Sequence, residues 1–444
     1  MEKITYNFSE QEGYIKPLHG VNNAPYAVLN EELSTEFMKG AGIPFSRLHD
    51  AMGPYGGSHY VDVPNIFPDF DADAADPSNY DFTLTDYYIG SIVKAGTEIF
   101  YRLGITIDWA KKKYRTFPPK DYLQWAKICE GIMRHYNEGW ADGFHYNIRY
   151  WEIWNEPENP PMWSGSKEEF FELYRVASKY LKNRFPQCKI GGYGSCGFYA
   201  VTREGMNDFY KGFVTYFHDF LKMVTAEKLP LDFFSWHIYT NDPCEVLKHG
   251  AYVRKTLDEY GLQDTETTLN EWNYGDEGTS HYEKRTMKGA SFVSSVLCGL
   301  QHEGHTDSAM YYCVSLGGLY NGMHDHVTGK YLKPYYALAA FHDLYRLGNN
   351  VKAEYRSNGK FCSAAATDGN HAVVLLSNHS DEEISAELVL DGIIKKKEIL
   401  AEYYLLDEMH DMDKIRTEIF RGDVAIPVVS LGARTVMKII ISIN

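Results

Sequence analysis

The sequence predicts an α/β fold, a closed (β/α)8 TIM barrel with a C-terminal β-sandwich domain. The chain has 444 residues, enough for one barrel of ~250 residues and a smaller domain. Strand-like and helix-like runs alternate as far as about residue 345, as in parallel α/β folds. After residue 348, short strand-like runs follow one another without helices, which is typical of a sandwich.

Eight strand-like runs precede residue 347. A glycine-rich dinucleotide fingerprint does not follow the first of them, so a closed barrel over residues 15–347 is favoured over an open Rossmann sheet. The predicted strands are His19–Val21, Phe45–His49, Glu98–Gly104, Ile148–Glu156, Lys189–Gly194, Asp232–Thr240, Thr268–Asn273 and Ser308–Ser315.

Amphipathic helices are predicted between these strands. Residues Asp121–Tyr136 and Glu168–Phe185 each carry an apolar stripe at helical spacing. Ser166 is a suitable N-cap for the second helix, and Pro186 ends it. These signals support the alternation of strand and helix on which the barrel prediction depends.

Residues 348–444 are expected to form the β-sandwich. Asp368-Gly369-Asn370 is a hairpin turn signal between two of its strands. Residues 1–14 are expected to be an N-terminal segment in which Ile4–Phe8 adds a strand to this sandwich. The predicted sandwich strands are Phe361–Ala366, His371–Ser377, Ile384–Leu390, Ile399–Leu406 and Val436–Ile441.

Composition excludes several classes of protein. Hydrophobic residues make up 44% and charged residues 23%, which is the globular norm. The net charge of −16 disfavours a nucleic-acid partner, and the richest apolar stretch is too short for a membrane span. Seven scattered cysteines and the absence of a secretory signal in Met1–Glu12 predict a cytoplasmic protein. Exposed sandwich edges would allow a homo-oligomer.

The strongest chemical signal is the segment Trp151-Glu152-Ile153-Trp154-Asn155-Glu156-Pro157. Pro157 ends strand pairing, which places Asn155 and Glu156 at the carboxyl end of the strand. Barrel enzymes hold their catalytic groups at this end. Taken alone, Glu156 could be a solvated loop carboxylate beside a turn.

A second run, Leu269-Asn270-Glu271-Trp272-Asn273-Tyr274, also places a carboxylate among aromatic residues. It lies three βα units after Glu156, nearly across the barrel mouth. Two facing carboxylates are what the cleavage of a glycosidic bond requires: one is protonated to release the leaving oxygen, and the other is ionised. Each alone would be explained as a surface glutamate, but the pair favours catalysis.

From Phe45 to about Leu344 the chain resembles glycoside hydrolase family 39, the β-xylosidase and α-L-iduronidase family of clan A. The segments that carry the resemblance occur in the family's order. They are FSRLHD, YDFTLTDYYIGSIVKAG, PPKDYLQW, YWEIWNEPENPPMW, FFSWHIYT, TLNEWN and KPYYALAAF.

The resemblance implies roles for residues at the predicted mouth. Glu156 matches the family's general acid/base and Glu271 its nucleophile. Asn155 matches the asparagine that binds the sugar 2-hydroxyl, and Arg47 matches an arginine near the nucleophile, where its charge would keep Glu271 ionised. Arg47 could instead pair with Glu152, because strand alternation puts Glu152 on the same face as Glu156.

Three further residues match the family's sugar pocket. Tyr239 resembles the tyrosine that donates a hydrogen bond to the nucleophile. His49 and His237 are similar to histidines of the −1 subsite, although a strand histidine is as often a satisfied core residue.

The sequence departs from the family on the eighth strand. The floor of the −1 subsite, usually a tryptophan in the clan, corresponds here to Tyr312. Acidic residues that follow this strand in family xylosidases are replaced by the segment Leu316–Leu319. The identity of the sugar therefore stays open at this point.

Neither of two candidate metal motifs is convincing, and we expect no cofactor and no metal. His324-Asp325-His326 lacks a third ligand in the motif. The acidic residues between Asp69 and Asp76 alternate like calcium ligands, but the sixth and twelfth positions are Ala74 and Tyr80 rather than Gly and Glu. A solvated acidic loop near the mouth is expected.

The sequence thus predicts a retaining exo-glycosidase that trims terminal sugars, first of all β-xylosides, from short oligosaccharides. On this reading burial and the charge of Glu271 should raise the pKa of Glu156. Activity of the β-galactosidase, β-glucosidase or arabinofuranosidase type on the same scaffold is the first alternative. A non-catalytic sugar-binding barrel and a metal-dependent hydrolase using His324 and His326 are the others.

Overall fold

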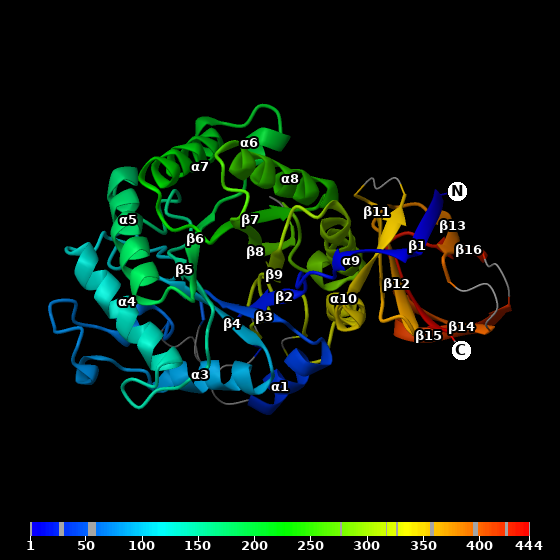
Figure 1. The fold of residues 1–444 in the computed structure, drawn as a ribbon, viewed down its shortest axis with the longest axis horizontal. Helices are drawn as coiled ribbons and strands as arrows, with labels where there is room; N and C mark the ends of the chain where they lie inside the picture. Colours follow the sequence, from blue (N-terminus) through cyan, green and yellow to red (C-terminus); the bar gives the residue numbers. More distant parts are fainter. Residues whose placement is uncertain are drawn as a thin grey trace.

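The structure is a computed structural model of the 444-residue chain. It describes residues 2–25, 31–51, 59–275, 278–316, 318–325, 327–355, 359–393, 398–421 and 425–443. A parallel barrel wrapped in helices forms one part of the molecule, and a β-sheet domain lies beside it (Figure 1). This arrangement confirms the predicted fold class.

The barrel closes from eight parallel strands in sequence order, β2 to β9. They are β2 (Gly20–Asn22), β3 (Phe45–Leu48), β4 (Glu98–Leu103), β5 (Tyr150–Ile153), β6 (Lys189–Ser195), β7 (Phe233–Thr240), β8 (Glu266–Tyr274) and β9 (Ser308–Tyr311). All eight overlap the predicted strand segments. In β3 and β5 every residue is buried, as expected for a parallel sheet covered on its outer face by helices.

Helices surround the barrel (Figure 1). They are α1 (Glu31–Gly40), α2 (Val63–Ile66), α3 (Thr83–Lys94), α4 (Tyr122–Asn137), α5 (Lys167–Arg184), α6 (Tyr199–Thr202), α7 (Asp208–Glu227), α8 (Pro243–Glu259), α9 (Met287–Glu303) and α10 (Lys333–Leu347). Ser166 caps α5 by the predicted route, in a reciprocal capping box with Glu169. Among the described residues, the helices include none with the length and apolar character of a membrane span.

The second domain is one nine-stranded sheet in the order β15-β14-β17-β12-β11-β10-β1-β13-β16. Its strands are β1 (Glu2–Tyr14), β10 (Asn349–Glu354), β11 (Phe361–Thr367), β12 (His371–Asn378), β13 (Ile384–Asp391), β14 (Glu398–Leu406), β15 (Asp411–Arg421), β16 (Ala425–Leu431) and β17 (Thr435–Ile443). The sheet curls so that one face encloses its own apolar core, to which Ile4, Val374, Leu388 and Ile439 belong. The N-terminal strand β1 lies between β10 and β13.

Helices α9 and α10 join the two domains. The face of β11 and β12 that points away from the sheet's own core packs on them, and Ala364, Val373 and Leu375 belong to the same apolar cluster as the barrel. A 2.9 Å hydrogen bond from the Ser295 hydroxyl to the Ser377 hydroxyl crosses this junction. The sheet domain therefore contacts the outside of the barrel, away from the residues described next.

Among the described strands, β10, β15 and β16 were not predicted from the sequence. Strand β15 reads DMDKIRTEIFR, so charge conceals its alternation, and it lies at one edge of the sheet. Strand β16 lies at the other edge and contains Pro427. Proline and exposed charge are tolerated at an edge because one side of such a strand needs no partner.

Candidate active site

The carboxyl end of β5 holds Asn155 and Glu156 in a constrained backbone. Trp154 and Glu156 have φ angles of +73° and +45°, a region that costs a non-glycine residue energy and is concentrated at functional sites. The amide N–H of Glu156 donates to the carbonyls of Tyr193 and Gly194 in β6, at 3.1 and 3.0 Å. These bonds fix the direction in which Glu156 leaves the strand.

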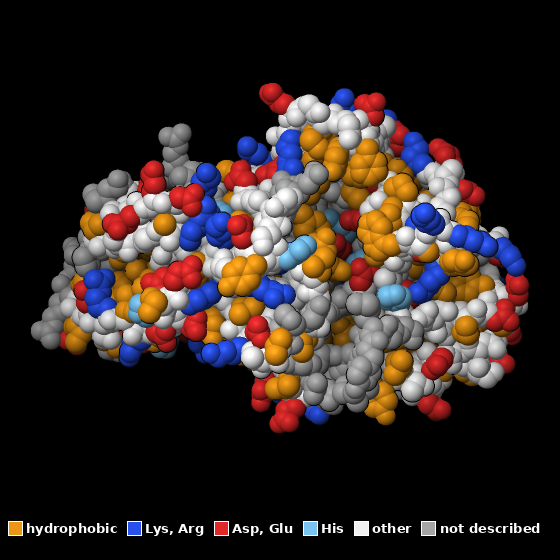
Figure 2. Space-filling view, turned by 180° about the vertical axis from the view of Figure 1, so that it is seen from behind, with side chains coloured by type: hydrophobic (Ala, Val, Ile, Leu, Met, Phe, Trp, Pro, Cys, Tyr) orange, Lys and Arg blue, Asp and Glu red, His pale blue; other side chains and the backbone are white. Residues whose placement is uncertain are grey.

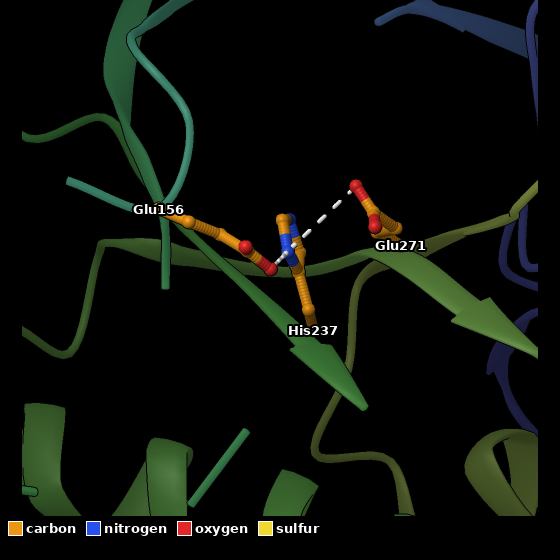
Figure 3. A group of neighbouring side chains, drawn as sticks. All are labelled: Glu156, His237 and Glu271. Atoms are coloured by element: carbon orange, nitrogen blue, oxygen red, sulfur yellow. Dashed lines mark hydrogen bonds and ion pairs between the residues drawn. The ribbon is translucent and has the colours of Figure 1, made fainter. Parts of the chain in front are cut away.

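Glu156 and Glu271 come from opposite sides of the mouth and point toward each other, with His237 of β7 between them (Figure 3). The Nδ1 atom of His237 lies 2.8 Å from Oε1 of Glu156 and 3.8 Å from Oε2 of Glu271. One oxygen of each carboxylate and this nitrogen all lie within 4.8 Å of one another. The two predicted carboxylates therefore converge on a space of the size of one sugar carbon and its substituents.

Arg47 of β3 forms hydrogen bonds with residues of both β5 and β8, the two strands that carry the catalytic candidates. Its guanidinium donates through Nε to Glu152 at 2.8 Å, through Nη1 to Glu271 at 3.1 Å and through Nη2 to Asn155 at 2.5 Å. The arginine and Glu152 are fully buried. The two partners that the sequence left open, Glu152 and Glu271, are thus both present, because the planar fork carries separate donors for each.

Glu152 is a buried carboxyl group with several hydrogen-bond partners inside the barrel. Besides Arg47, it accepts hydrogen bonds at 2.6 Å from Ser235 and from Asn270. A buried carboxylate needs such partners because burial without them would cost several kcal/mol. Glu152 therefore serves to orient Arg47, which in turn contacts Glu271.

Tyr239 at the end of β7 donates a 2.6 Å hydrogen bond from its hydroxyl to Oε1 of Glu271. Burial raises the pKa of Tyr239 well above its ordinary value, so its hydroxyl stays protonated. The carboxylate of Glu271 thus has a donor on each oxygen, Tyr239 on one and Arg47 on the other.

The pKa of Glu156 differs from the sequence-based expectation. Burial raises it, but the hydrogen bond and positive charge of His237 outweigh burial, so the net pKa of Glu156 is lowered rather than raised. The expected shift was wrong because it counted Glu271 and burial but not an imidazole in contact. Burial and the charge of Glu156 raise the pKa of Glu271, although His237 and Arg47 oppose them. The pKa of His237 is raised, because Glu271 and Glu156 outweigh burial.

His49 and Tyr312 lie on the other side of the mouth, around Asp50. The Tyr312 hydroxyl donates to Oδ2 of Asp50 at 2.9 Å, and His49 Nδ1 accepts from Nε of Arg102 at 3.2 Å. Burial lowers the pKa of His49 well below its ordinary value, so its ring is neutral. The residue that replaces the expected tryptophan is therefore fixed by a hydrogen bond at its tip.

A cavity of about 690 Å³ opens over these groups, and Asn155, Glu156, His237, Tyr239 and Glu271 line it. The face in Figure 2 is hollowed near its centre, where acidic and histidine side chains are surrounded by hydrophobic ones. Aromatic side chains of this cavity are Trp109, Tyr199, Phe209, Phe213, Tyr312 and Tyr320. Flat aromatic faces and polar groups at the base suit the binding of a sugar ring.

Several lining residues were not singled out from the sequence. Asp50, Trp109 and Tyr320 lie on loops after strands, where no periodic pattern marks a residue, and Phe209 lies in the first turn of α7. Asp50 directly follows His49, so its place in the matched FSRLHD segment was the one available signal. Trp109 is 74% exposed, which is unusual for a tryptophan and consistent with a binding surface.

Potential metal ligands in this part of the chain have other partners. Nδ1 of His237 is hydrogen-bonded to Glu156 at 2.8 Å, closer than two ligands of one Zn²⁺ ion would lie. Asp69, Asp73 and Asp76 each accept a hydrogen bond from a backbone N–H two residues on. Their side chains therefore stabilise turns of their own loop.

His324 is 1% exposed and packs against the rings of Phe37 and Tyr331, 4.5 and 5.7 Å away. Burial lowers its pKa to about 4. His326 lies outside the described residues. His324 thus occupies an aromatic environment rather than a polar one.

Comparisons with known proteins agree with this geometry. The family model described as Glycosyl hydrolases family 39 matches residues 65–271, which include both Glu156 and Glu271. A β-xylosidase from Geobacillus stearothermophilus is 25% identical over 228 residues, or 48% of this chain and 38% of the relative. The chain matches less than two fifths of the length of the curated relatives.

Solved structures match over the whole chain. A glucosidase from Croceicoccus marinus superposes with a TM-score of 0.79 at 22% identity, covering 100% of this chain and 99% of that one. A monomeric β-xylosidase from Caulobacter crescentus superposes with a TM-score of 0.70 at 15% identity, with the same coverage. The fold is therefore shared from end to end, and the match of residues 65–271 to the family model, together with the β-xylosidase relatives, supports glycosyl hydrolase family 39.

Proposed function

We propose that this protein is a retaining glycoside hydrolase that releases terminal sugars, β-xylosides above all, from short oligosaccharides. The observation that carries the proposal is the approach of Glu156 and Glu271, whose carboxylate oxygens come within 4.8 Å of each other. Retaining enzymes hold their two carboxyl groups ~5–5.5 Å apart, whereas inverting enzymes leave ~6.5–9.5 Å for a water molecule. The short separation supports direct attack by one carboxylate.

In the first step, Glu271 attacks the anomeric carbon while Glu156 gives a proton to the leaving oxygen. Arg47 and Tyr239 hold the Glu271 carboxylate by one hydrogen bond on each oxygen. This fixes the direction of attack and saves the entropy of orienting the nucleophile at the moment of reaction. A covalent glycosyl-enzyme forms, and the leaving group departs with the proton.

The proton for this step lies between His237 and Glu156 in the unliganded site. Their 2.8 Å hydrogen bond, with the pKa of His237 raised and that of Glu156 lowered, puts the proton mainly on the imidazole. We propose that it moves along this bond to Glu156 when substrate is bound, leaving a neutral imidazole. His237 is thus a positioning and proton-sharing partner of the acid.

In the second step, Glu156 has become a carboxylate and removes a proton from water. The water attacks the anomeric carbon and displaces Glu271, so the sugar leaves with its original configuration. Hydrogen bonds from Arg47 and Tyr239 to the departing Glu271 carboxylate stabilise the charge that it regains. The site returns to its starting state with one water consumed.

The arrangement of the mouth supports removal of single terminal residues. The hydrogen bond between Asp50 and Tyr312 joins the ends of β3 and β9 across the short strand β2, on the side away from Glu156. A chain of sugars would have to pass this bridge to extend further. Two curated relatives are β-xylosidases, which puts β-xylosides first among the substrates.

The test uses nitrophenyl β-xyloside, β-glucoside, β-galactoside and α-arabinofuranoside with wild type, Glu271→Gln and Glu156→Ala. We expect Glu271→Gln to abolish turnover of every substrate. Glu156→Ala should still release nitrophenol, a good leaving group. Added azide should speed breakdown of the glycosyl-enzyme, because this anion attacks the anomeric carbon without a base and displaces Glu271 as a glycosyl azide. Proton NMR of the first product should show the retained anomer.

Four results would contradict the proposal. Inversion at the anomeric carbon would contradict the assignment of Glu271 as nucleophile. An equal loss of activity in Glu156→Ala on substrates with good and with poor leaving groups would contradict the assignment of Glu156 as acid. If wild type turned over none of these substrates, the result would favour the alternative of a non-catalytic sugar-binding barrel. Random internal cuts in a xylan polymer would refute exo action.

A further inference from the structure

Asp50 is a carboxylate in the active-site cavity for which the two-step reaction above has no use. It follows β3 directly, and its side chain is 18% exposed and lines the same cavity as Glu156 and Glu271. Its φ angle is +53°, a conformation that glycine adopts freely and that non-glycine residues adopt at an energetic cost. A strained aspartate beside the reacting groups suggests that its carboxylate is used.

Neighbouring donors hold this carboxylate in one orientation. Tyr312 donates to Oδ2 at 2.9 Å, and the backbone N–H of Ile107 donates to Oδ1 at 3.3 Å. Nε2 of His49 lies 3.3 Å from the same Oδ1. The carboxylate is thus contacted from three places: the loop after β4, the residue that follows β9 and the residue that follows β3.

Arg102 decides which nitrogen of His49 carries the proton. An arginine only donates, so the 3.2 Å contact from its Nε makes Nδ1 of His49 the acceptor. The neutral ring then carries its hydrogen on Nε2, which faces Asp50. A carboxylate has about four acceptor sites. The two hydrogen bonds from Tyr312 and Ile107, with the contact from His49, leave capacity for hydroxyl groups in the cavity.

The position of Asp50 in the barrel fixes which part of a substrate it can meet. The leaving group has to lie beside the acid Glu156, at the end of β5, and His237 of β7 stands next to it. Asp50 and Tyr312 lie at β3 and β9, on the two sides of β2. They therefore face the end of the sugar ring that points away from the bond to be cleaved.

We infer that Asp50, held by Tyr312 and His49, accepts hydrogen bonds from the hydroxyl groups at the non-reducing end of the terminal sugar and so selects substrates in which these hydroxyls are free. The inference rests on the proposed function and deepens it. A carboxylate accepts but does not donate, so an acetylated or glycosylated hydroxyl would lose the bond and also meet the Tyr312 ring. Substituted termini are expected to be poor substrates.

The test compares Asp50→Asn and Asp50→Gly with wild type. Asparagine keeps the shape and glycine suits the φ of +53°, so both variants should fold, which thermal unfolding checks. Asp264→Asn, at an exposed aspartate in the loop before β8, is the matched control. The substrates are the best nitrophenyl glycoside of the panel and its 3-deoxy and 4-deoxy analogues.

Loss of a hydrogen bond to a charged group should lower kcat/KM of Asp50→Asn about 10- to 100-fold on the parent glycoside. On the deoxy analogue that lacks the partner hydroxyl, the same substitution should change kcat/KM less than about threefold, because the bond is already missing. An equal loss on the parent and on both analogues would overturn the inference, since Asp50 would then only support the pocket.

A binding measurement separates this inference from the proposed reaction. The parent glycoside is titrated into Glu271→Gln and into the double variant Glu271→Gln/Asp50→Asn, and affinity should fall about 10- to 100-fold in the second. Equal affinities, or no binding to either, would overturn the inference even if wild type is active. If the double variant binds more weakly but wild type turns over no substrate, the proposed hydrolysis is refuted and the role of Asp50 in binding is not.

Discussion

Removing the hydroxyl of Tyr239 should move the acidic limb of the pH–rate profile to higher pH. In Tyr239→Phe, Glu271 loses the 2.6 Å hydrogen bond on Oε1 and keeps the one from Arg47 on Oε2. That bond favours the ionised form of Glu271, so its removal raises the pKa of Glu271 further above its ordinary value. Since Glu271 attacks as a carboxylate, activity should then be lost at a higher pH on acidification.

The size of the effect follows from the strength of one hydrogen bond to a charged group, about 1.5–3 kcal/mol. At 1.36 kcal/mol per pKa unit, the acidic limb should shift upward by about 1–2 pH units. The second step should also slow by about 10- to 150-fold, because the departing carboxylate loses the donor that stabilises its charge. A burst of nitrophenol before steady state would report the accumulated intermediate.

The assay is kcat/KM for the best nitrophenyl glycoside between pH 4 and pH 8, which reports the groups of the free enzyme. Tyr320→Phe is the matched control, because Tyr320 lines the same cavity and its ring lies 5.3 Å from that of Tyr239. The control should leave the acidic limb in place. An unmoved limb in Tyr239→Phe, or one displaced to lower pH, would refute the electrostatic account of Glu271.

Three further predictions concern stability and substrate binding. Arg47→Met leaves the buried carboxylates of Glu152 and Glu271 without their cation and should lower the free energy of unfolding, measured in urea, by about 3–5 kcal/mol. Arg149→Met is the control: the ion pair of Arg149 with Glu98 is about half exposed, so its loss should cost less than about 1 kcal/mol. Equal losses of stability in the two variants would contradict the role given to the buried network. Burial raises the pKa of Glu158 from 4.5 to about 8. The folded protein thus keeps a proton that the unfolded chain releases, and wild type should lose about 3–5 kcal/mol of stability relative to Glu158→Gln as pH rises from 4.5 to 8, with parallel pH–stability curves as the contrary result. Trp109→Ala removes a 74% exposed aromatic face from the cavity that Glu156 also lines and should raise KM for xylobiose roughly 2- to 12-fold without changing thermal stability. Tyr114→Ala, at a residue that is 69% exposed but outside this cavity, should leave KM unchanged.

Sequence patterns were enough to predict the barrel and to single out its two facing carboxylates. Alternating apolar runs are a local property, because each strand and helix has to bury one face whatever its neighbours are. The position of Glu156 could be predicted from local sequence as well, because Pro157 ends the strand and the carboxyl end of a strand in a parallel barrel faces the mouth. Strands β15 and β16 could not be predicted, since edge strands carry charged residues or proline that obscure the alternation of apolar and polar residues.

The balance of charges at the mouth could not be predicted from sequence patterns, because it depends on contacts between distant segments. The sign of the pKa shift of Glu156 depends on a 2.8 Å contact with His237, which lies 81 residues further along the chain. Arg47 contacts Glu152, Asn155 and Glu271 at once because β5, with its carboxyl end, and β8 converge on its guanidinium. The use of Asp50 likewise follows from its backbone angle and from Tyr312, 262 residues away. Electrostatic energies change steeply over a few ångströms, and such distances between remote segments are set by packing rather than by local sequence.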